Sequence, residues 1–522
     1  MLKDYEKTNG PVVSVLIPTY NRLQSLYEAL ASVFHQSYKN LQVIVVNDGG
    51  EDVSDVIDSF GESRLLYINR KENRGKAFSL NEALNEVEGK YIAYLDDDDV
   101  YYPFHIEALV NALENETDCR VAYSDLYKAY CKVFPDGSRQ ILSKVVEVSR
   151  DFDRFLMLNF NHVLHVSLMH HRDLIEKTGP YNEQLNVLID WDLTRRLAFF
   201  SDFYHVHRVT GEYSHPMGDC DRISVQRRKD KQEYLRNVLT VRTTRPPKPW
   251  PKIEDLSIIF VADRLDKSAG KTIGSIWQHT FYPYKLYLPM LQSDFDRLNT
   301  DMPNLVFVNL DGGSTQAQQV DAALEKCEGQ YIAIVTSGFP IKDMWIEIPL
   351  FALINYANDR QGFQPEQATE QLWAAVLRKD DLKRARREFP DLSVSESIKA
   401  AGVNLRKPSH REYPFQFDNM YHLALSVEKD GDWLQAAQMY EQIAQQHKNV
   451  LWMKRLAAKA FFMASDHAKA EELCCEINRH QPTVEILLLE AKIKRENKKY
   501  NSAIKLLTMA ANTLEGHELI WT

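Results

Sequence analysis

Near-continuous apolar runs alternate with amphipathic segments along the N-terminal part of the chain. The apolar runs predict buried strands, and they lie at residues 12–18, 41–46, 65–68 and 91–95. Between them, residues 23–36, 53–60 and 77–87 carry apolar side chains at helical spacing. This βαβαβαβ order predicts an α/β fold with a parallel, doubly wound sheet. Ligands of such sheets bind beyond the carboxyl ends of the strands.

The fourth predicted strand ends in four consecutive carboxylates, Asp96 to Asp99. Their charges repel one another, and Mg²⁺ or Mn²⁺ prefers carboxylate oxygen as a ligand. A metal ion held there would still need phosphate oxygens to complete its coordination shell. A solvated acidic turn is the alternative, and it would be favoured if this run were the only signal.

Composition narrows the class of protein. The chain has 522 residues, 44% of them hydrophobic and 26% charged, which is typical of globular domains. Its net charge of −10 argues against a nucleic-acid partner, because phosphate recognition needs a basic surface. We find no apolar segment long enough to cross a membrane and no apolar signal core in residues 1–10. We therefore expect a cytoplasmic protein.

Four motifs follow one another in the predicted sheet: Val15–Arg22, Val45–Gly49, Asn73–Gly75, and Glu88–Ala93 leading into the aspartates. Their order and spacing resemble the inverting family 2 glycosyltransferases, which have the GT-A nucleotide-sugar-binding fold. The resemblance implies a hexosyltransferase that uses a nucleotide-diphosphate sugar, with UDP as the expected nucleotide, and Mn²⁺ or Mg²⁺ as cofactor. It also implies a set of donor-binding residues: Pro18, Thr19, Tyr20, Arg22, Asp48, Arg74, Lys76, Asp96, Asp97 and His165.

Several of these roles have a physical reason. Tyr20 matches the position that packs the base, where an aromatic ring stacks well. Asp48 matches the carboxylate that accepts the imino hydrogen of uracil, although an Asp before Gly-Gly also suits a helix N-cap. The resemblance makes Asp98 the main metal ligand and turns Asp97 toward the ribose. Asp96 and His215 are the further expected metal ligands. Because the four aspartates are consecutive and identical, the sequence leaves open which of them fills each role.

The segment from Leu185 to Leu193 resembles the E-D-W-D-L motif of the family, with Ile189 in place of the first acid. Asp190 then matches the catalytic base. Direct displacement at an anomeric carbon needs such a base, because the attacking hydroxyl must lose its proton. The alternative is a helix N-terminus that an Asp merely caps.

Two extended segments, 121–130 and 138–148, flank a Phe134–Gly137 turn and predict a hairpin beside the acceptor. The histidine-rich stretch 161–172 raises a zinc hypothesis, which the absence of Cys or a helical His spacing disfavours. Residues 222–248 are basic, so they either touch anionic lipid peripherally or form a solvated face.

A partial copy of the first domain follows. Glu328–Ala333 repeats Glu88–Ala93, but Thr336–Phe339 stands where the first copy has its aspartates. We therefore predict a catalytic domain at 1–245, a Pro-rich linker at 246–252 and a degenerate GT-A-like domain at 253–405, kept for packing, dimer contact or acceptor binding.

Residues 418–522 predict helices with a loose repeat. Similar pairs recur 34 and 33 residues apart: Ala436 with Tyr440, Ala470 with Cys474, and Ala503 with Leu507. The pattern resembles tetratricopeptide repeats, which implies a concave surface for a protein or peptide, or for a homodimer.

Two hypotheses of different class emerge. The first is a metal-dependent glycosyltransferase whose acceptor is a surface glycan or a protein, such as a flagellin or a secreted peptide. The alternative is a non-catalytic nucleotide-sugar-binding scaffold that acts through its second domain and its repeats. The intact aspartate run and Asp190 favour the enzyme.

Overall fold

The computed structural model describes residues 10–134, 137–147, 149–217, 230–298, 302, 304–369, 373–446 and 451–515. Part of the predicted hairpin turn (135–136), residues 1–9 and residues 218–229 of the basic segment lie outside the described residues. The chain forms two compact units, one of residues 1–234 with 417–522 and the other of residues 235–416.

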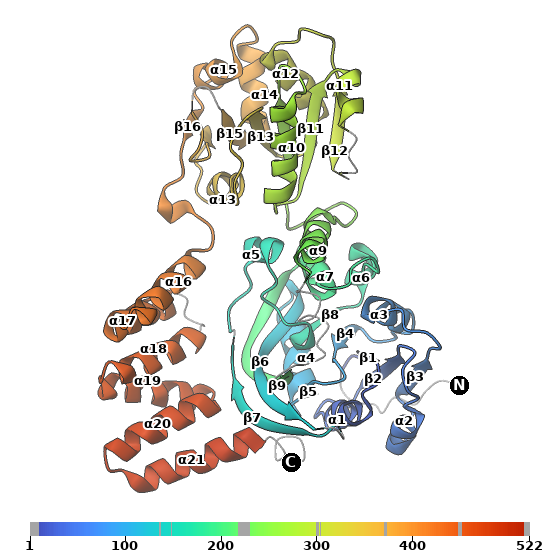
Figure 1. Ribbon diagram of the computed structural model, residues 1–522, viewed down its shortest axis with the longest axis vertical. Coiled ribbons are helices and arrows are strands. Elements are labelled where there is room, and N and C mark those ends of the chain that lie inside the picture. Colours follow the sequence, from blue (N-terminus) through green and yellow to red (C-terminus); the bar gives the residue numbers. More distant parts are fainter. Residues whose placement is uncertain are drawn as a thin grey trace. The chain divides into compact units, whose positions relative to one another are not determined.

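The first unit is built on a mixed sheet with strand order β3-β2-β1-β4-β8-β6-β9-β5, and β7 pairs with β6 (Figure 1). Its strands are β1 Val13–Thr19, β2 Leu41–Asn47, β3 Leu65–Asn69, β4 Tyr91–Tyr94, β5 Val100–Tyr101, β6 Cys119–Val133, β7 Arg139–Val145, β8 Leu168–His171 and β9 Asp202–Pro216. The helical segments are α1 Leu23–Phe34, α2 Ser54–Phe60, α3 Lys76–Asn85, α4 His105–Asn115, α5 Arg154–Asn159, η1 His165–Ser167, α6 Asp173–Thr178 and α7 Ile189–Leu197.

Strands β1 to β4 confirm the predicted parallel arrangement. β1 pairs in parallel with both β2 and β4, and β2 pairs in parallel with β3. β2 and β4 are buried along their whole length, because helices cover both faces of this part of the sheet. The carboxyl ends of β1, β2 and β4 therefore lie side by side.

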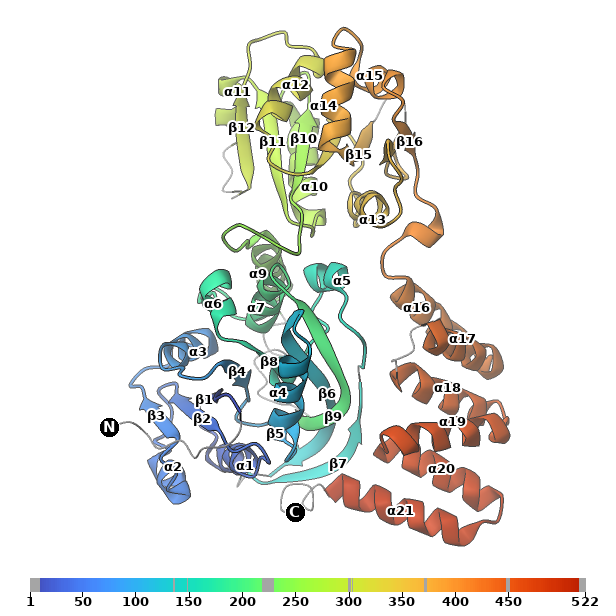
Figure 2. The ribbon, with the colours of Figure 1, turned by 180° about the vertical axis from the view of Figure 1, so that it is seen from behind.

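The other half of the sheet is partly antiparallel. β8 lies antiparallel between β4 and β6, and the long strands β6 and β9 run parallel to each other. β6 and β7 form the predicted hairpin. In Figure 2, α4 lies against β6 and β9.

The second unit has its own sheet, with strand order β12-β11-β10-β13-β15-β14-β16. Its strands are β10 Leu256–Val261, β11 Tyr284–Met290, β12 Leu305–Asn309, β13 Tyr331–Thr336, β14 Gln361–Phe363, β15 Ala374–Arg378 and β16 Asn404–Arg406. Its helical segments are α10 Lys267–His279, α11 Gln292–Arg297, α12 Gln316–Lys326, α13 Glu347–Asn355, α14 Lys379–Glu388, α15 Val394–Ala400 and η2 His410–Glu412, while α9 Lys231–Thr243 spans the boundary of the units. The first four strands in this order are parallel to one another, as in β3-β2-β1-β4.

The C-terminal residues are helical. The helices are α16 Gln416–Lys429, α17 Trp433–Gln446, α18 Leu451–Met463, α19 His467–His480, α20 Val484–Glu496 and α21 Tyr500–Glu515. From α17 to α21 each helix packs against the next, and Ala436 and Ala470 are fully buried at these contacts. Leu507, in contrast, is 48% exposed. Within the described residues, every helix is too short or too polar to span a bilayer.

Candidate active site

Three carboxylates converge where β4 ends. One carboxylate oxygen from each of Asp96, Asp98 and Asp99 lies within 4.8 Å of the other two. The backbone N–H of Ser214, on β9, donates to Oδ1 of Asp99 at 2.9 Å. Arg139, on β7, donates to the carbonyl oxygen of Asp98 at 2.6 Å, so residues of β9 and β7 hold the turn that carries the aspartates.

Two cations face these carboxylates. Nη1 of Arg22 lies 2.7 Å from Oδ2 of Asp98, and Nζ of Lys76 lies 2.5 Å from Oδ1 of Asp96. Burial alone would lower the pKa of Lys76, but the charges of Asp96, Asp190 and Asp99 outweigh burial and raise it. Lys76 therefore stays charged, and the charges of both Asp96 and Asp190 act on it.

Asp97 is not a member of this group among the described residues, and its carboxylate contacts the end of β1 and the loop that follows. Its carboxylate accepts hydrogen bonds from Oγ1 of Thr19 at 2.8 Å and from Arg22 at 2.9 Å. Burial raises the pKa of Asp97 to about 6, although Arg22 opposes the shift. Asp97 thus ties the end of β1 to the end of β4, and its ribose role stays a prediction.

Asp48 follows β2 and holds the loop before α3. Its two carboxylate oxygens accept the backbone N–H groups of Arg74 at 2.9 Å and Gly75 at 2.8 Å, and Nη1 of Arg70 lies 2.8 Å away. The N-cap position of α2 belongs to Val53, so Asp48 does not occupy it.

The remaining predicted donor residues surround this edge of the sheet. Pro18 lies in β1 opposite Val46, and Tyr20 follows β1 with 46% of its surface exposed, so its ring is accessible for stacking. The exposed guanidinium of Arg74 lies 3.4 Å from the centre of the Phe78 ring. These positions surround the carboxyl ends of β1, β2 and β4.

Asp190 lies in the first turn of α7 and is partly exposed. The N-cap residue of α7 is Leu188, in a left-handed conformation with φ of 64°, so Asp190 is not the cap. Nδ2 of Asn161 donates to Oδ2 of Asp190 at 3.3 Å. Trp191 anchors the helix through a 2.8 Å hydrogen bond to the Met157 carbonyl oxygen.

His165 is buried beside the carboxylate group. Its ring stacks on Tyr94 with centroids 4.2 Å apart, and Nε2 lies 2.7 Å from the Tyr181 hydroxyl. Burial, together with the charge of Lys76, lowers the pKa of His165 to about 3 against the opposing charge of Asp96. The imidazole is therefore neutral. Within the described residues, its Nδ1 is buried without a hydrogen-bond partner.

His215 is not a member of the carboxylate group among the described residues. Its ring meets the edge of the Tyr130 ring, with centroids 5.0 Å apart. Its neighbour Ser214 makes the contacts to Asp98 and Asp99 instead. The metal role of His215 stays a prediction.

Sequence reasoning missed several residues. Asp99 joins Asp96 and Asp98 because the chain turns after Asp96, where the N–H of Asp99 donates to the Asp96 carbonyl oxygen. A second group, Asp151 with His205 and His207, lies outside the histidine-rich stretch that raised the zinc hypothesis. The His-x-His spacing of 205 and 207 could have revealed it, since alternate residues of a strand share one face.

Comparison with known proteins gives one family. The family model for glycosyl transferase family 2 matches residues 14–169. An uncharacterized glycosyltransferase of Rickettsia prowazekii is 34% identical over 207 residues, which cover 38% of this chain and 63% of that protein. Another, of Bacillus subtilis, is 30% identical over 200 residues, covering 38% of this chain and 70% of that protein. The chain thus spans less than two thirds of the Rickettsia relative.

Solved structures show weaker similarity. A mannosyltransferase of Pyrobaculum calidifontis, in complex with GDP-Man and Mn²⁺, is 20% identical with a TM-score of 0.34, covering 46% of this chain and 67% of that one. TarS of S. aureus, in complex with UDP-GlcNAc, is 19% identical with a TM-score of 0.33, covering 44% of this chain and 66% of that one.

Proposed function

The chain belongs to glycosyl transferase family 2, and from this premise we propose that it is a metal-dependent inverting hexosyltransferase that uses a nucleotide-diphosphate sugar. The acceptor is a hydroxyl group of a glycan or a protein. The observation that carries the proposal is the convergence of Asp96, Asp98 and Asp99 at the end of β4, where Lys76 pairs with Asp96.

The residues at the end of β4 suit a hard divalent cation. All three ligand atoms are carboxylate oxygens within 4.8 Å of one another, and Mg²⁺ and Mn²⁺ favour such ligands. Asp98 and Asp96, with Asp99, would hold the ion, and His215 is a further proposed ligand. When bound, the ion neutralises negative charge on the leaving nucleoside diphosphate.

The chain's own residues supply the rest of the chemistry. Asp190 accepts the proton of the acceptor hydroxyl as the oxygen attacks the anomeric carbon, and one displacement inverts that centre. Lys76 and Arg22 bring positive charge to the edge of the sheet where the diphosphate would lie. Nδ1 of His165, which has no hydrogen-bond partner among the described residues, is a further polar atom beside Asp96.

We propose UDP as the nucleotide. Tyr20 is exposed beyond β1 and would stack on the base. Asp48 lies at the end of the adjacent strand β2, where it would accept the imino hydrogen of uracil. Its carboxylate also orders the loop before α3 through the Arg74 and Gly75 N–H groups, so the same residue would shape the base pocket and recognise the base.

Nucleotide release from a panel of nucleotide sugars, with and without Mn²⁺, tests the proposal. We expect metal-dependent release from one donor and a loss of at least about 100-fold in Asp98→Asn and in Asp190→Asn. Asp359→Asn, an exposed aspartate of the second unit, is the control and should match the wild type. Donor binding without nucleotide release by the wild type would instead support a binding scaffold, and unchanged release in Asp190→Asn would contradict the role of Asp190 as the base.

A further inference from the structure

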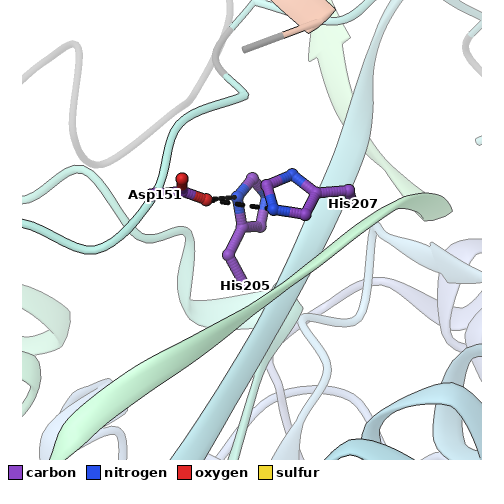
Figure 3. A group of neighbouring side chains, drawn as sticks. All are labelled: Asp151, His205 and His207. Carbon is purple, nitrogen blue, oxygen red and sulfur yellow. Dashed lines mark hydrogen bonds and ion pairs between the residues drawn. The ribbon is translucent and has the colours of Figure 1, made fainter. Parts of the chain in front are cut away.

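Two histidines of β9 and one aspartate meet away from the carboxylates of β4. His205 and His207 are alternate residues of the strand, and the centroids of their rings lie 4.1 Å apart. Figure 3 shows both imidazoles turned toward Asp151, which lies in the segment before α5. Oδ1 of Asp151 lies 3.1 Å from Nδ1 of His205 and 3.0 Å from Nε2 of His207.

A second carboxylate, that of Asp125, contacts the other ring nitrogen of His205 and orients the imidazole. Nε2 of His205 lies 2.9 Å from Oδ1 of Asp125, on β6, and the other oxygen of Asp125 accepts a hydrogen bond from Ser149 at 2.7 Å. The His205 side chain is only 2% exposed and lies parallel to the Tyr123 ring. Asp125 therefore occupies Nε2 and leaves Nδ1 directed at Asp151 and His207.

We propose that Asp151, His205 and His207 form a second metal site, specific for Zn²⁺ or a similar transition-metal ion. Two imidazole nitrogens with one carboxylate oxygen favour Zn²⁺ over Mg²⁺ and Ca²⁺, which select oxygen ligands. A histidine that binds a metal commonly donates its other N–H to a carboxylate, which is the role of Asp125 here. The three protein ligands leave a fourth position open for water or another donor.

The two distances from Asp151 to the imidazole nitrogens are close to those in a zinc site, and all three ligand atoms lie within 4.8 Å of one another. Ligands of a tetrahedral Zn²⁺ lie about 3.4 Å apart, given zinc–ligand distances of about 2.1 Å. The two nitrogen–oxygen distances are 3.0 and 3.1 Å, so the Asp151 carboxylate would move by only a few tenths of an ångström. Asp151 is 52% exposed at its side chain, which gives it that freedom.

A metal here would stabilise a junction of the fold. Asp151 lies next to Arg150, whose Nη1 pairs with Oδ1 of Asp418, on α16, at 2.7 Å. The Tyr123 hydroxyl also donates to the Arg150 carbonyl oxygen at 2.7 Å. Zinc would join this segment to β9 and so strengthen the attachment of α16 to the sheet. A ligand that binds only the folded state raises the unfolding temperature.

Zinc binding to the full chain, made without a histidine tag and stripped with EDTA, tests the site. We expect titration to show a zinc site in the wild type. His207→Gln and Asp151→Asn should each lower the zinc affinity at least about 10-fold, and Asp125→Asn should lower it by about 10- to 100-fold. Co²⁺ should bind in place of zinc and give the strong visible absorption of four-coordinate cobalt. Zinc should also raise the unfolding temperature of the wild type more than that of His207→Gln.

Two control variants distinguish zinc binding at this site from zinc binding elsewhere. Asp98→Asn removes one of the carboxylates that follow β4, and it should retain the zinc site. His279→Gln removes a lone His–Asp pair, in which Nδ1 of His279 lies 2.6 Å from Oδ1 of Asp343, and should also retain it. Equal zinc affinity in the wild type, His207→Gln and Asp151→Asn would overturn the proposal, as would zinc binding that Asp98→Asn abolishes. Both test variants alter partly exposed side chains, and metal-free unfolding curves establish that they fold.

Discussion

Nζ of Lys76 lies 2.5 Å from Oδ1 of Asp96, and the charge of Asp190 also acts on this ammonium group. Lys76 begins α3, whereas Asp96 follows β4 and Asp190 lies in α7. One cation therefore connects the carboxylates proposed to bind the metal with the carboxylate proposed as the base. Burial would raise the pKa of Asp96, but opposing interactions, of which the charge of Lys76 is the largest, outweigh burial and lower it.

Lys76→Gln should lower the rate of metal-dependent nucleotide release by about 100-fold, because it removes a fixed positive charge from the proposed diphosphate site. Steady-state kinetics with the preferred donor would measure the change. Lys90→Gln is a matched control, since Nζ of Lys90 pairs with Glu114 at 2.6 Å at the opposite end of β4. A similar loss in both variants would show a general effect of lysine removal instead of a role at the site.

Much of the parallel half-sheet could be predicted from the sequence. Strands such as β1 and β2 are covered on both faces, so they form continuous apolar runs that need no knowledge of partners. The long pairing of β6 with β9 could not be predicted in this way. It joins Cys119 to Asp202 and continues to Pro216, and such non-local pairing leaves little local pattern.

The residues of the candidate sites divide in the same way, into those with a local sequence signal and those without one. The motif around Asp96 and the segment around Asp190 are local, and the sequence alone singled them out. Asp151 and His205 are 54 residues apart in the sequence, and Asp125 and His205 are 80 residues apart. The local sequence around one residue therefore does not predict its contact with the other. The contacts of Asp97 with Thr19 and Arg22 cross 78 and 75 residues, so the sequence around Asp97 does not indicate them either.

Gly89 and Gly329 occupy equivalent, crowded positions in the two sheets. The N–H of Gly89 donates to Oγ of Ser14 at 2.9 Å, and that of Gly329 donates to Oγ of Ser257 at 3.1 Å. A Cβ at Gly89 would lie 2.7 Å from the Ser14 nitrogen, and one at Gly329 would lie 2.4 Å from the Asp255 carbonyl oxygen. The recurring glycine therefore reflects backbone packing.

Gly89→Ala and Gly329→Ala should each destabilise their own unit by about 1–3 kcal/mol, because the neighbouring backbone must shift. Urea unfolding followed by hydrogen exchange would locate the loss. Gly270→Ala is the control, since a Cβ there meets nothing within 4 Å on α10, and it should stabilise by up to about 1 kcal/mol. Unchanged stability in both crowded variants would contradict the packing argument.

Asp418→Asn should weaken the attachment of α16. The side chain of Arg150 is only 11% exposed, and its guanidinium loses a charged partner in the variant. We expect a loss of about 1–2 kcal/mol in the free energy of unfolding. Asp430→Asn, at an exposed position near the end of α16, is the control. Equal effects of the two substitutions would indicate that the Arg150 pair contributes no stability.

Glu347 is a buried acid in the second unit. It is fully buried at the start of α13, and Oε1 accepts the backbone N–H groups of Phe281 at 2.7 Å and Tyr282 at 3.2 Å. Burial raises the pKa of Glu347 from 4.5 to about 7, although the two N–H groups oppose the shift. The folded state therefore binds this proton more tightly than the unfolded state.

The stability of the second unit should consequently fall as pH rises from about 4.5 to about 7, by roughly 3 kcal/mol for this group, and then level off. Glu347→Gln stays neutral and keeps the acceptor oxygen, so it should remove this slope. The variant should match the wild type near pH 4.5 and exceed it near pH 8. Hydrogen exchange of the Phe281 and Tyr282 amides in the full chain, at stepped pH, measures the difference locally. An equal gain in stability at both pH values would show that the substitution acts through packing, because only the free-energy cost of the buried charge depends on pH.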